Sequence, residues 1–277
     1  MSDNWIVEIL QNALTTWNNK LNEVWTLIST SPEAFKGGAV WGVIQNIHGG
    51  LKAIGYALLV LFFVVGVVKT CGSFAEVKRP EVAVKMFVRF ALAEAAITYG
   101  MELMLAILSV CQGVISGIMG ASGMGGQTAL SLPDTIVTAI ESVGFLDSIP
   151  LWIVSLLASL LITVLSFVVV LTVYSRFFKL YFHAAIAPVA LASFAGQPSQ
   201  SIGVSFLKSY AGVCLEGAII VLACVIYSAF ATSEPAVSGT TAVNMVWSYI
   251  GELVFNLLVL VGAVRLADQT VKQMLGL

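Results

Sequence analysis

Long apolar stretches interrupted by few charged residues dominate the hydrophobic pattern of this 277-residue chain. A helix that crosses a membrane needs about 20 mostly apolar residues. Five segments meet or approach this length and are predicted to span the membrane: 53–68, 87–119, 151–174, 209–231 and 247–266. The segment 87–119 is too long for one straight span. The pattern predicts an all-α, polytopic integral membrane protein with five transmembrane helices.

Two further segments have the spacing of amphipathic helices, with apolar residues recurring at every third or fourth position. The first covers the N-terminal thirty residues and includes Trp5, Trp17 and Trp25, which suit a lipid headgroup region. The second runs from Pro133 to Phe145. Either apolar face could pack on the helix bundle of its own chain. Contact with a lipid surface or with a neighbouring subunit is the alternative. We assign 1–50 to extracytoplasmic amphipathic helices and 51–277 to the membrane domain.

Composition supports a membrane protein and excludes several other classes. The chain is 58% hydrophobic and 10% charged, against about 25% charged in soluble domains. Its net charge of -2 gives no sign of bulk nucleic-acid binding. The first ten residues lack the pattern of a cleaved signal peptide, so the first span is expected to direct insertion. The cysteines are scattered and indicate neither a metal site nor a disulfide framework: Cys71, Cys111, Cys214 and Cys224.

Lysine and arginine in the loops predict the orientation, because these residues resist translocation across the membrane. The loop from Lys69 to Arg89 contains five of them and is predicted to be cytoplasmic. The loop 120–150 contains none and is predicted to lie outside. The later loops alternate in the same way, which predicts an N-out, C-in topology with five crossings.

Charged residues and a proline interrupt the hydrophobic tract that follows the third predicted span. Arg176, Lys179, His183 and Pro188 lie in this tract. A crossing here would reverse the predicted side of every later loop. We therefore predict a cytoplasmic-side re-entrant or interfacial segment at 176–208. Pro188 is expected to break its helix, because proline lacks an N–H donor and clashes with the carbonyl four residues earlier.

Four carboxylates fall within the predicted spans, where ionisable groups often mark ion or proton pathways: Glu94, Glu102, Glu216 and Glu252. Glu94 and Glu102 are eight residues apart and are expected on one side of a single helix. The carboxylates could instead neutralise nearby Arg and Lys residues or hydrogen-bond between helices. The second interpretation is favoured, because the charges cluster toward the span ends and no inverted repeat typical of transporters is visible.

One stretch, from Tyr174 to Tyr227, has a distinctive order of residues. An Arg followed by two aromatics leads through an aromatic run to Ala-Pro and small residues. A Lys-Ser helix follows, with a polar residue before an apolar run that ends in Tyr. In this chain the pattern consists of Arg176, Phe177, Phe178, Tyr181, Ala187, Pro188, Lys208, Ser209, Glu216 and Tyr227. It resembles the TrbL-like polytopic membrane subunit of type IV secretion systems in Gram-positive conjugative elements. Relatives more often have Gln at the position of Glu216.

The resemblance implies a non-enzymatic channel or scaffold subunit of the cytoplasmic membrane that forms a ring-shaped homo-oligomer. Its expected partners are other type IV secretion subunits, including the cytoplasmic ATPases, and single-stranded DNA bound to a relaxase. The chain has no Walker A loop, so an ATP-binding site is not expected. No cofactor or catalytic residue is expected either.

Arg176, Lys179 and His183 are expected to form a cationic ring in such an oligomer. This ring could hold phospholipid headgroups or steer a nucleic-acid backbone. The alternative function is a small-solute or ion transporter that uses Glu94, Glu102 and Glu216.

Overall fold

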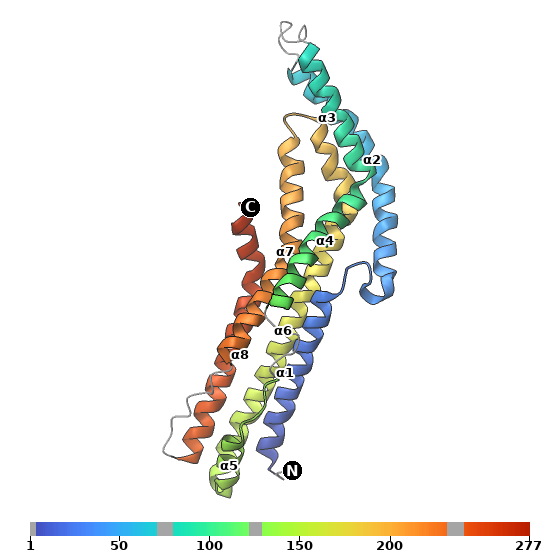
Figure 1. The fold of residues 1–277 in the computed structure, drawn as a ribbon. Helices are drawn as coiled ribbons and strands as arrows, with labels where there is room; N and C mark the ends of the chain where they lie inside the picture. Colours follow the sequence, from blue (N-terminus) through green and yellow to red (C-terminus); the bar gives the residue numbers. More distant parts are fainter. Residues whose placement is uncertain (1–3, 71–79, 122–128, 232–240) are drawn as a thin grey trace. The chain divides into compact units, whose positions relative to one another are not determined.

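A computed structural model describes residues 4–70, 80–121, 129–231 and 241–277. Within these ranges every regular element is a helix, which confirms the all-α prediction. In chain order the elements are α1 (Trp5–Ser29), η1 (Phe35–Gly38), α2 (Ala39–Thr70), α3 (Pro80–Thr98), α4 (Gly100–Ala121), α5 (Asp134–Ser142), α6 (Phe145–Leu191), η2 (Ala192–Ala195), α7 (Gln200–Ala231) and α8 (Ala242–Leu275) (Figure 1).

Five helical segments are long and apolar enough to cross a membrane: Phe35–Lys69, Gly100–Ala121, Asp147–Ala195, Gln200–Ala229 and Ala242–Leu275. Each overlaps one of the five spans predicted from the sequence. The prediction of a multi-pass membrane protein is therefore confirmed. The N-out, C-in orientation stays a prediction.

The predicted span 87–119 does not form one helix. It is divided between α3 and α4, which meet at Tyr99. Hydrogen bonds from the Tyr99 amide to the Ala95 carbonyl and from the Leu103 amide to the Tyr99 carbonyl, both 2.9 Å, continue through the junction. Glu94 and Glu102 therefore lie on two different helices, and the expectation that they share one helix is wrong.

Helix α6 is much longer than the predicted span 151–174. Its 47 residues extend about 70 Å at 1.5 Å per residue, more than twice the apolar thickness of a bilayer. The expected end at Tyr174 and the expected break at Pro188 are wrong, because α6 continues to Leu191. The chain then turns through η2 and Gly196 into α7. The membrane location of 176–208 stays a prediction.

Contacts with α2 explain how α6 passes through Pro188. Because Pro188 has no N–H, the carbonyl of Ala184 loses its helical donor. His48 Nδ1 lies 2.7 Å from that carbonyl oxygen and donates the missing hydrogen bond. Seven residues along α2, Gly55 packs on the proline: a Cβ atom at Gly55 would lie 2.9 Å from the Pro188 carbonyl oxygen. The cost of the proline is thus offset by a neighbouring helix.

The chain forms two compact units, which are described separately. Unit 1 comprises Met1–Ser29, Ile115–Ser175 and Ile219–Ala267. Unit 2 comprises Thr30–Val114, Arg176–Ala218 and Asp268–Leu277. The predicted division into 1–50 and 51–277 concerns location relative to the membrane and stays a prediction, although α2 continues without interruption across residue 50.

In unit 1 both amphipathic segments pack on their own bundle. Helix α1 runs parallel to α6: the rings of Trp5 and Trp152 are 5.3 Å apart, and Tyr174 donates to Glu23 near the other end. Helix α1 buries the apolar positions that its periodicity predicts: Ile6, Val7, Leu10, Ala13, Leu14, Trp17, Val24, Leu27 and Ile28. Helix α5 buries Ile136, Ala139 and Ile140.

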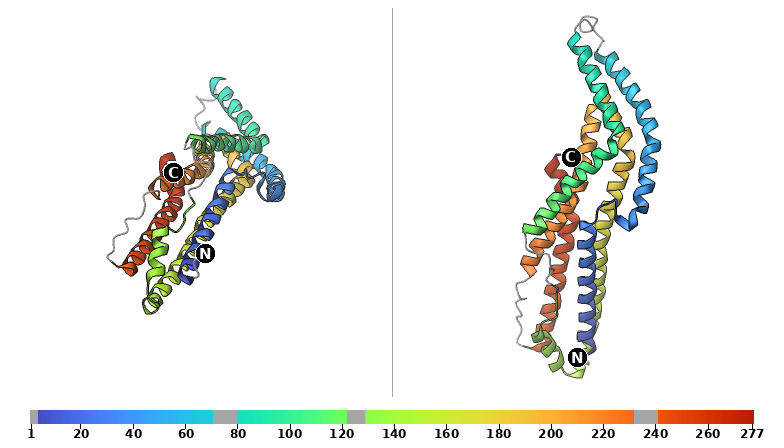
Figure 2. Two further views of the ribbon diagram at one scale, coloured as in Figure 1. Left: turned by 60° about the horizontal axis from the view of Figure 1, so that its bottom comes forward. Right: turned by 45° about the vertical axis from the view of Figure 1, so that its right-hand side comes forward.

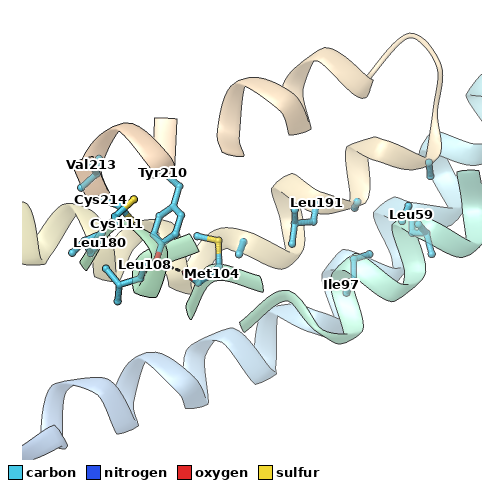
Figure 3. Packing of buried hydrophobic residues seen from close by; sticks show 14 residues of the cluster. Leu59, Ile97, Met104, Leu108, Cys111, Leu180, Leu191, Tyr210, Val213 and Cys214 are labelled. Atoms are coloured by element: carbon cyan, nitrogen blue, oxygen red, sulfur yellow. Dashed lines mark hydrogen bonds between the residues drawn. The ribbon is translucent and has the colours of Figure 1, made fainter. Parts of the chain in front are cut away.

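In unit 2, α2 and α3 lie side by side, as the right-hand view of Figure 2 shows, and both pack against η2. The buried core of this unit joins α2, α3, α4, α6, η2 and α7 (Figure 3). Within this core the Tyr210 hydroxyl of α7 donates to the Met104 carbonyl of α4 over 3.0 Å. Cys111 and Cys214 are buried free thiols in the same core. Cys71 lies outside the described residues.

Candidate functional site

A group of charged residues links three helices within unit 2. We call it the ionic cluster: Arg176 and Lys179 of α6, Glu216 of α7, and Asp268 and Lys272 of α8. The two α6 residues are three positions apart and the two α8 residues are four apart, so each pair shares one helix face. The antiparallel courses of α6 and α7 and of α7 and α8 bring the faces together.

Arg176 is buried, with 3% of its surface exposed. Its Nε atom donates to the Val213 carbonyl at 3.3 Å, and Nη2 donates to the Cys214 carbonyl at 3.2 Å. A carbonyl oxygen has two lone pairs, so it can accept this second bond in addition to its helical one. The guanidinium group fits because residue 217 is a glycine: a Cβ atom at Gly217 would lie 2.5 Å from the guanidinium carbon. Arg176 therefore holds α6 directly against the α7 backbone.

Lys179 is the centre of the ionic cluster. Its Nζ atom is 3.2 Å from Glu216 Oε2 and 2.9 Å from Asp268 Oδ1. The second oxygen of Asp268 pairs with Lys272 at 2.8 Å. The side chain of Glu216 is only 2% exposed, whereas that of Lys179 is 34% exposed. A buried carboxylate is costly without a counter-charge, and Lys179 is the cation in direct contact with the carboxylate of Glu216.

His183 lies one turn beyond Lys179 and contacts α7. Its Nδ1 atom is 2.7 Å from the carbonyl oxygen of Lys179 and must donate to it. In the neutral ring Nε2 is then an acceptor, and Ser209 Oγ lies 3.2 Å away to donate the second bond. The ring also lies 5.5 Å from Phe206 and 6.0 Å from Tyr210. These contacts fix the tautomer and orientation of the imidazole.

The structure thus brings Arg176, Lys179 and His183 together against α7. Each of them is engaged with groups of the same chain: Arg176 with carbonyls, Lys179 with carboxylates, and His183 with a carbonyl and a hydroxyl. Their contact with phospholipid headgroups or a nucleic-acid backbone stays a prediction, and Lys179 retains the exposure that such a contact needs.

The other predicted carboxylates are not brought into this cluster. Glu94 is exposed and accepts a hydrogen bond from Thr98 Oγ1 at 3.1 Å. Glu102 is exposed, and Glu252 is partly buried on α8. Across the described ranges, none of the ion pairs includes Glu94, Glu102 or Glu252. Glu216, by contrast, makes the neutralising contact that the sequence analysis weighed against an ion pathway.

Three residues of the site were missed at the level of sequence: Asp268, Lys272 and Gly217. Asp268 is one helical turn before Lys272 near the end of the last apolar helix, and this charge pair was the available signal. Because Asp268 is 89 positions from Lys179 in the sequence, local spacing does not predict their contact. In the part of the chain that the structure describes, no group of three or more His, Cys, Asp and Glu residues could hold a metal ion.

Comparison with protein families identifies a match to this chain. The model described as "TrbL/VirB6 plasmid conjugal transfer like protein" matches residues 17–188, which is 172 of the 277 residues. This range includes Arg176, Lys179, His183 and Pro188, whereas Glu216 and Asp268 lie beyond it. Comparison with curated proteins gave no match, and comparison with solved structures gave none either.

Proposed function

Because the chain belongs to the TrbL/VirB6-like family of plasmid conjugal transfer proteins, and is thus a multi-pass membrane component of a type IV secretion system, we propose that it is a channel or scaffold subunit. It would form a homo-oligomer in the cytoplasmic membrane and contribute to the path of transferred DNA or protein. The observation that carries this proposal is the family match over residues 17–188. Members of this family are structural components of the secretion machine and associate with its other subunits.

The distribution of buried residues supports an oligomer. In the most apolar 18-residue stretch of α7, 56% of the residues are buried within the chain. The corresponding share is 17% in α2 and 22% in α4. Helix α7 is therefore buried to a larger extent than α2 and α4, many of whose apolar side chains are only partly buried or are exposed. Lipid tails are as apolar as these side chains, so neighbouring copies could pack there through close-fitting surfaces. We assign the proposed subunit contacts to α2 and α4.

The ionic cluster supports a scaffold more than a solute pathway. Glu216 is occupied by Lys179, and Asp268 is shared by Lys179 and Lys272. Such pairs hold α6, α7 and α8 in one register. A small-solute or ion transporter remains the alternative, but it would have to release Glu216 from a buried ion pair.

Deleting the gene from its conjugative element is expected to abolish DNA transfer, and a wild-type copy supplied in trans is expected to restore it. The measurement is the number of transconjugants per donor. Levels of the cytoplasmic ATPases serve as the control for polar effects. Chemical cross-linking of the full-length protein in membranes should yield a ladder of multimers. Unchanged transfer after deletion would contradict the proposed function, and an exclusively monomeric protein would contradict the ring.

The predicted topology places the turn between α6 and α7 in the cytoplasm. We expect a cysteine at the exposed position Pro198 to resist a membrane-impermeant thiol reagent in intact cells and to react after lysis. Cys71→Ser supplies the background, because Cys111, Cys214 and Cys224 are buried. A cysteine at Ser131, in the loop 120–150, is the outside control and should react in both preparations. Labelling of Pro198→Cys in intact cells would instead require a crossing between residues 174 and 198.

A further inference from the structure

A groove of about 430 Å³ opens on unit 2 between α3, η2 and the first residue of α7. Basic and apolar side chains line it side by side: Lys85 and Arg89, with Val84, Val88, Leu92 and Phe194. Its volume lies within the range of small-molecule sites, about 300–1,000 Å³. The groove is separate from the ionic cluster and has no part in the function proposed above.

The two basic residues of the groove lack ion-pair partners within the part of the chain that the structure describes. Lys85 and Arg89 are one helical turn apart, so both can reach a single anionic group. Among the described residues, neither takes part in an ion pair or a side-chain hydrogen bond. This differs from Lys179 and Arg176, whose donors are engaged by protein oxygens. The groove therefore offers two free donors to an anion, and arginine in particular suits the geometry of a phosphate.

The aliphatic residues of the groove are exposed. Val84 is 61% exposed, Val88 52% and Leu92 66%. They lie on the same helix as the two basic residues, within one or two turns of them. A ligand that satisfies both kinds of side chain must have an anionic group joined directly to hydrocarbon.

We propose that this groove binds an anionic phospholipid. Its phosphate lies between Lys85 and Arg89, and an acyl chain follows Val88 and Leu92 toward Phe194. The orientation predicted from the loop charges places α3 at the cytoplasmic leaflet, where anionic lipids attract basic residues next to membrane helices. A nucleic-acid strand fits less well, because binding of single strands uses aromatic platforms along a basic track and the exposed lining here is aliphatic.

The bound lipid would act as a structural bridge. Helix α3 packs against η2, and the groove is formed jointly by α3, η2 and the start of α7. A phospholipid seated there would hold α3 against the turn that connects α6 to α7.

The test is lipid binding by the full-length protein purified in detergent, measured by native mass spectrometry. The probes are phosphatidylglycerol and phosphatidylcholine with identical chains, inorganic phosphate, and a single-stranded oligonucleotide. Phosphatidylglycerol is expected to bind preferentially, with an affinity that falls as salt is raised. In the K85Q/R89Q variant the affinity for phosphatidylglycerol is expected to fall about 30-fold, because each basic residue near an anionic headgroup contributes about a factor of five.

The matched control is K208Q/R265Q, which removes the same charge from exposed positions outside the groove and should bind as wild type. Lys85 is exposed and Arg89 partly so, and hence the groove variant should fold. The lipid preference and salt dependence of the wild-type protein test the proposal without any variant. Equal binding of both lipids, equal losses in the two double variants, or displacement of the lipid by phosphate or by the oligonucleotide would overturn it.

Discussion

Replacing Lys179 with methionine is expected to destabilise unit 2 by about 2 to 3 kcal/mol, because it leaves the buried carboxylate of Glu216 without its counter-charge. Removing one partner of a buried ion pair typically costs about 3–5 kcal/mol. The expected loss lies just below this range because the side chain of Lys179 is 34% exposed. Asp268 keeps its pair with Lys272 and should add little. Thermal unfolding of the detergent-purified protein measures the effect.

The double variant Lys179→Met with Glu216→Leu is expected to recover most of this stability. Apolar replacement of both partners removes the uncompensated charge and leaves a packed contact. The matched control is Lys20→Met, which breaks the partly exposed pair with Glu23 and should cost about 1 kcal/mol or less. An unaltered unfolding temperature in Lys179→Met, or no recovery in the double variant, would contradict a structural role for the pair.

The same double variant separates that structural role from the cationic role predicted for Lys179 in the substrate path. If the lysine acts only by neutralising Glu216, DNA transfer should recover along with stability. A double variant that is stable and normally abundant but defective in transfer would favour a direct contact of Lys179 with substrate or headgroups. Transconjugant frequency and membrane abundance, measured on the same strains, give the answer.

Gly55→Ala is expected to destabilise unit 2 by about 2 kcal/mol, the effect of forcing one extra carbon into a tightly packed contact. The added Cβ would lie 2.9 Å from the Pro188 carbonyl oxygen and 3.1 Å from its carbonyl carbon. These are backbone atoms and cannot move aside as a flexible side chain would. Helix α2 would have to separate from α6, which also weakens the hydrogen bond from His48 to Ala184.

Gly50→Ala, on the same helix, is the control and is expected to have the opposite sign. Nothing lies within 4 Å of a Cβ atom at that position, so alanine should stabilise the helix by up to about 1 kcal/mol. Comparing the unfolding temperatures of the two variants separates the packing effect from helix propensity. A similar shift in both would show that α2 does not depend on close contact with Pro188.

Several properties of this protein could be predicted from single residues and their neighbours in sequence. Apolar length alone identified all five candidate spans, because only a run of about 20 apolar residues can cross a bilayer. The three- and four-residue periodicity of the first thirty residues identified the buried face of α1. The order of residues from Tyr174 to Tyr227 suggested the TrbL-like family, whose family model matches residues 17–188 of the chain.

The errors have a common origin in contacts between distant segments. Pro188 was expected to end its helix, but His48, 136 residues away from Ala184, supplies the hydrogen bond that a proline removes. Helix α6 therefore continues to Leu191 and is far longer than a membrane span requires. Glu94 and Glu102 were expected on one helix, and the junction at Tyr99 separates them.

The sequence by itself determined the class of the protein, its membrane spans and its family, since these follow from hydrophobic length and local order. Only the tertiary structure decided what the charged residues do. Arg176 and Lys179 are both basic residues within an apolar tract of the sequence. Arg176 donates to carbonyls of α7 in the space that Gly217 leaves, whereas Lys179 pairs with Glu216 and Asp268. A charge within a membrane protein is stabilised by its partner, and the partner is set by helix packing.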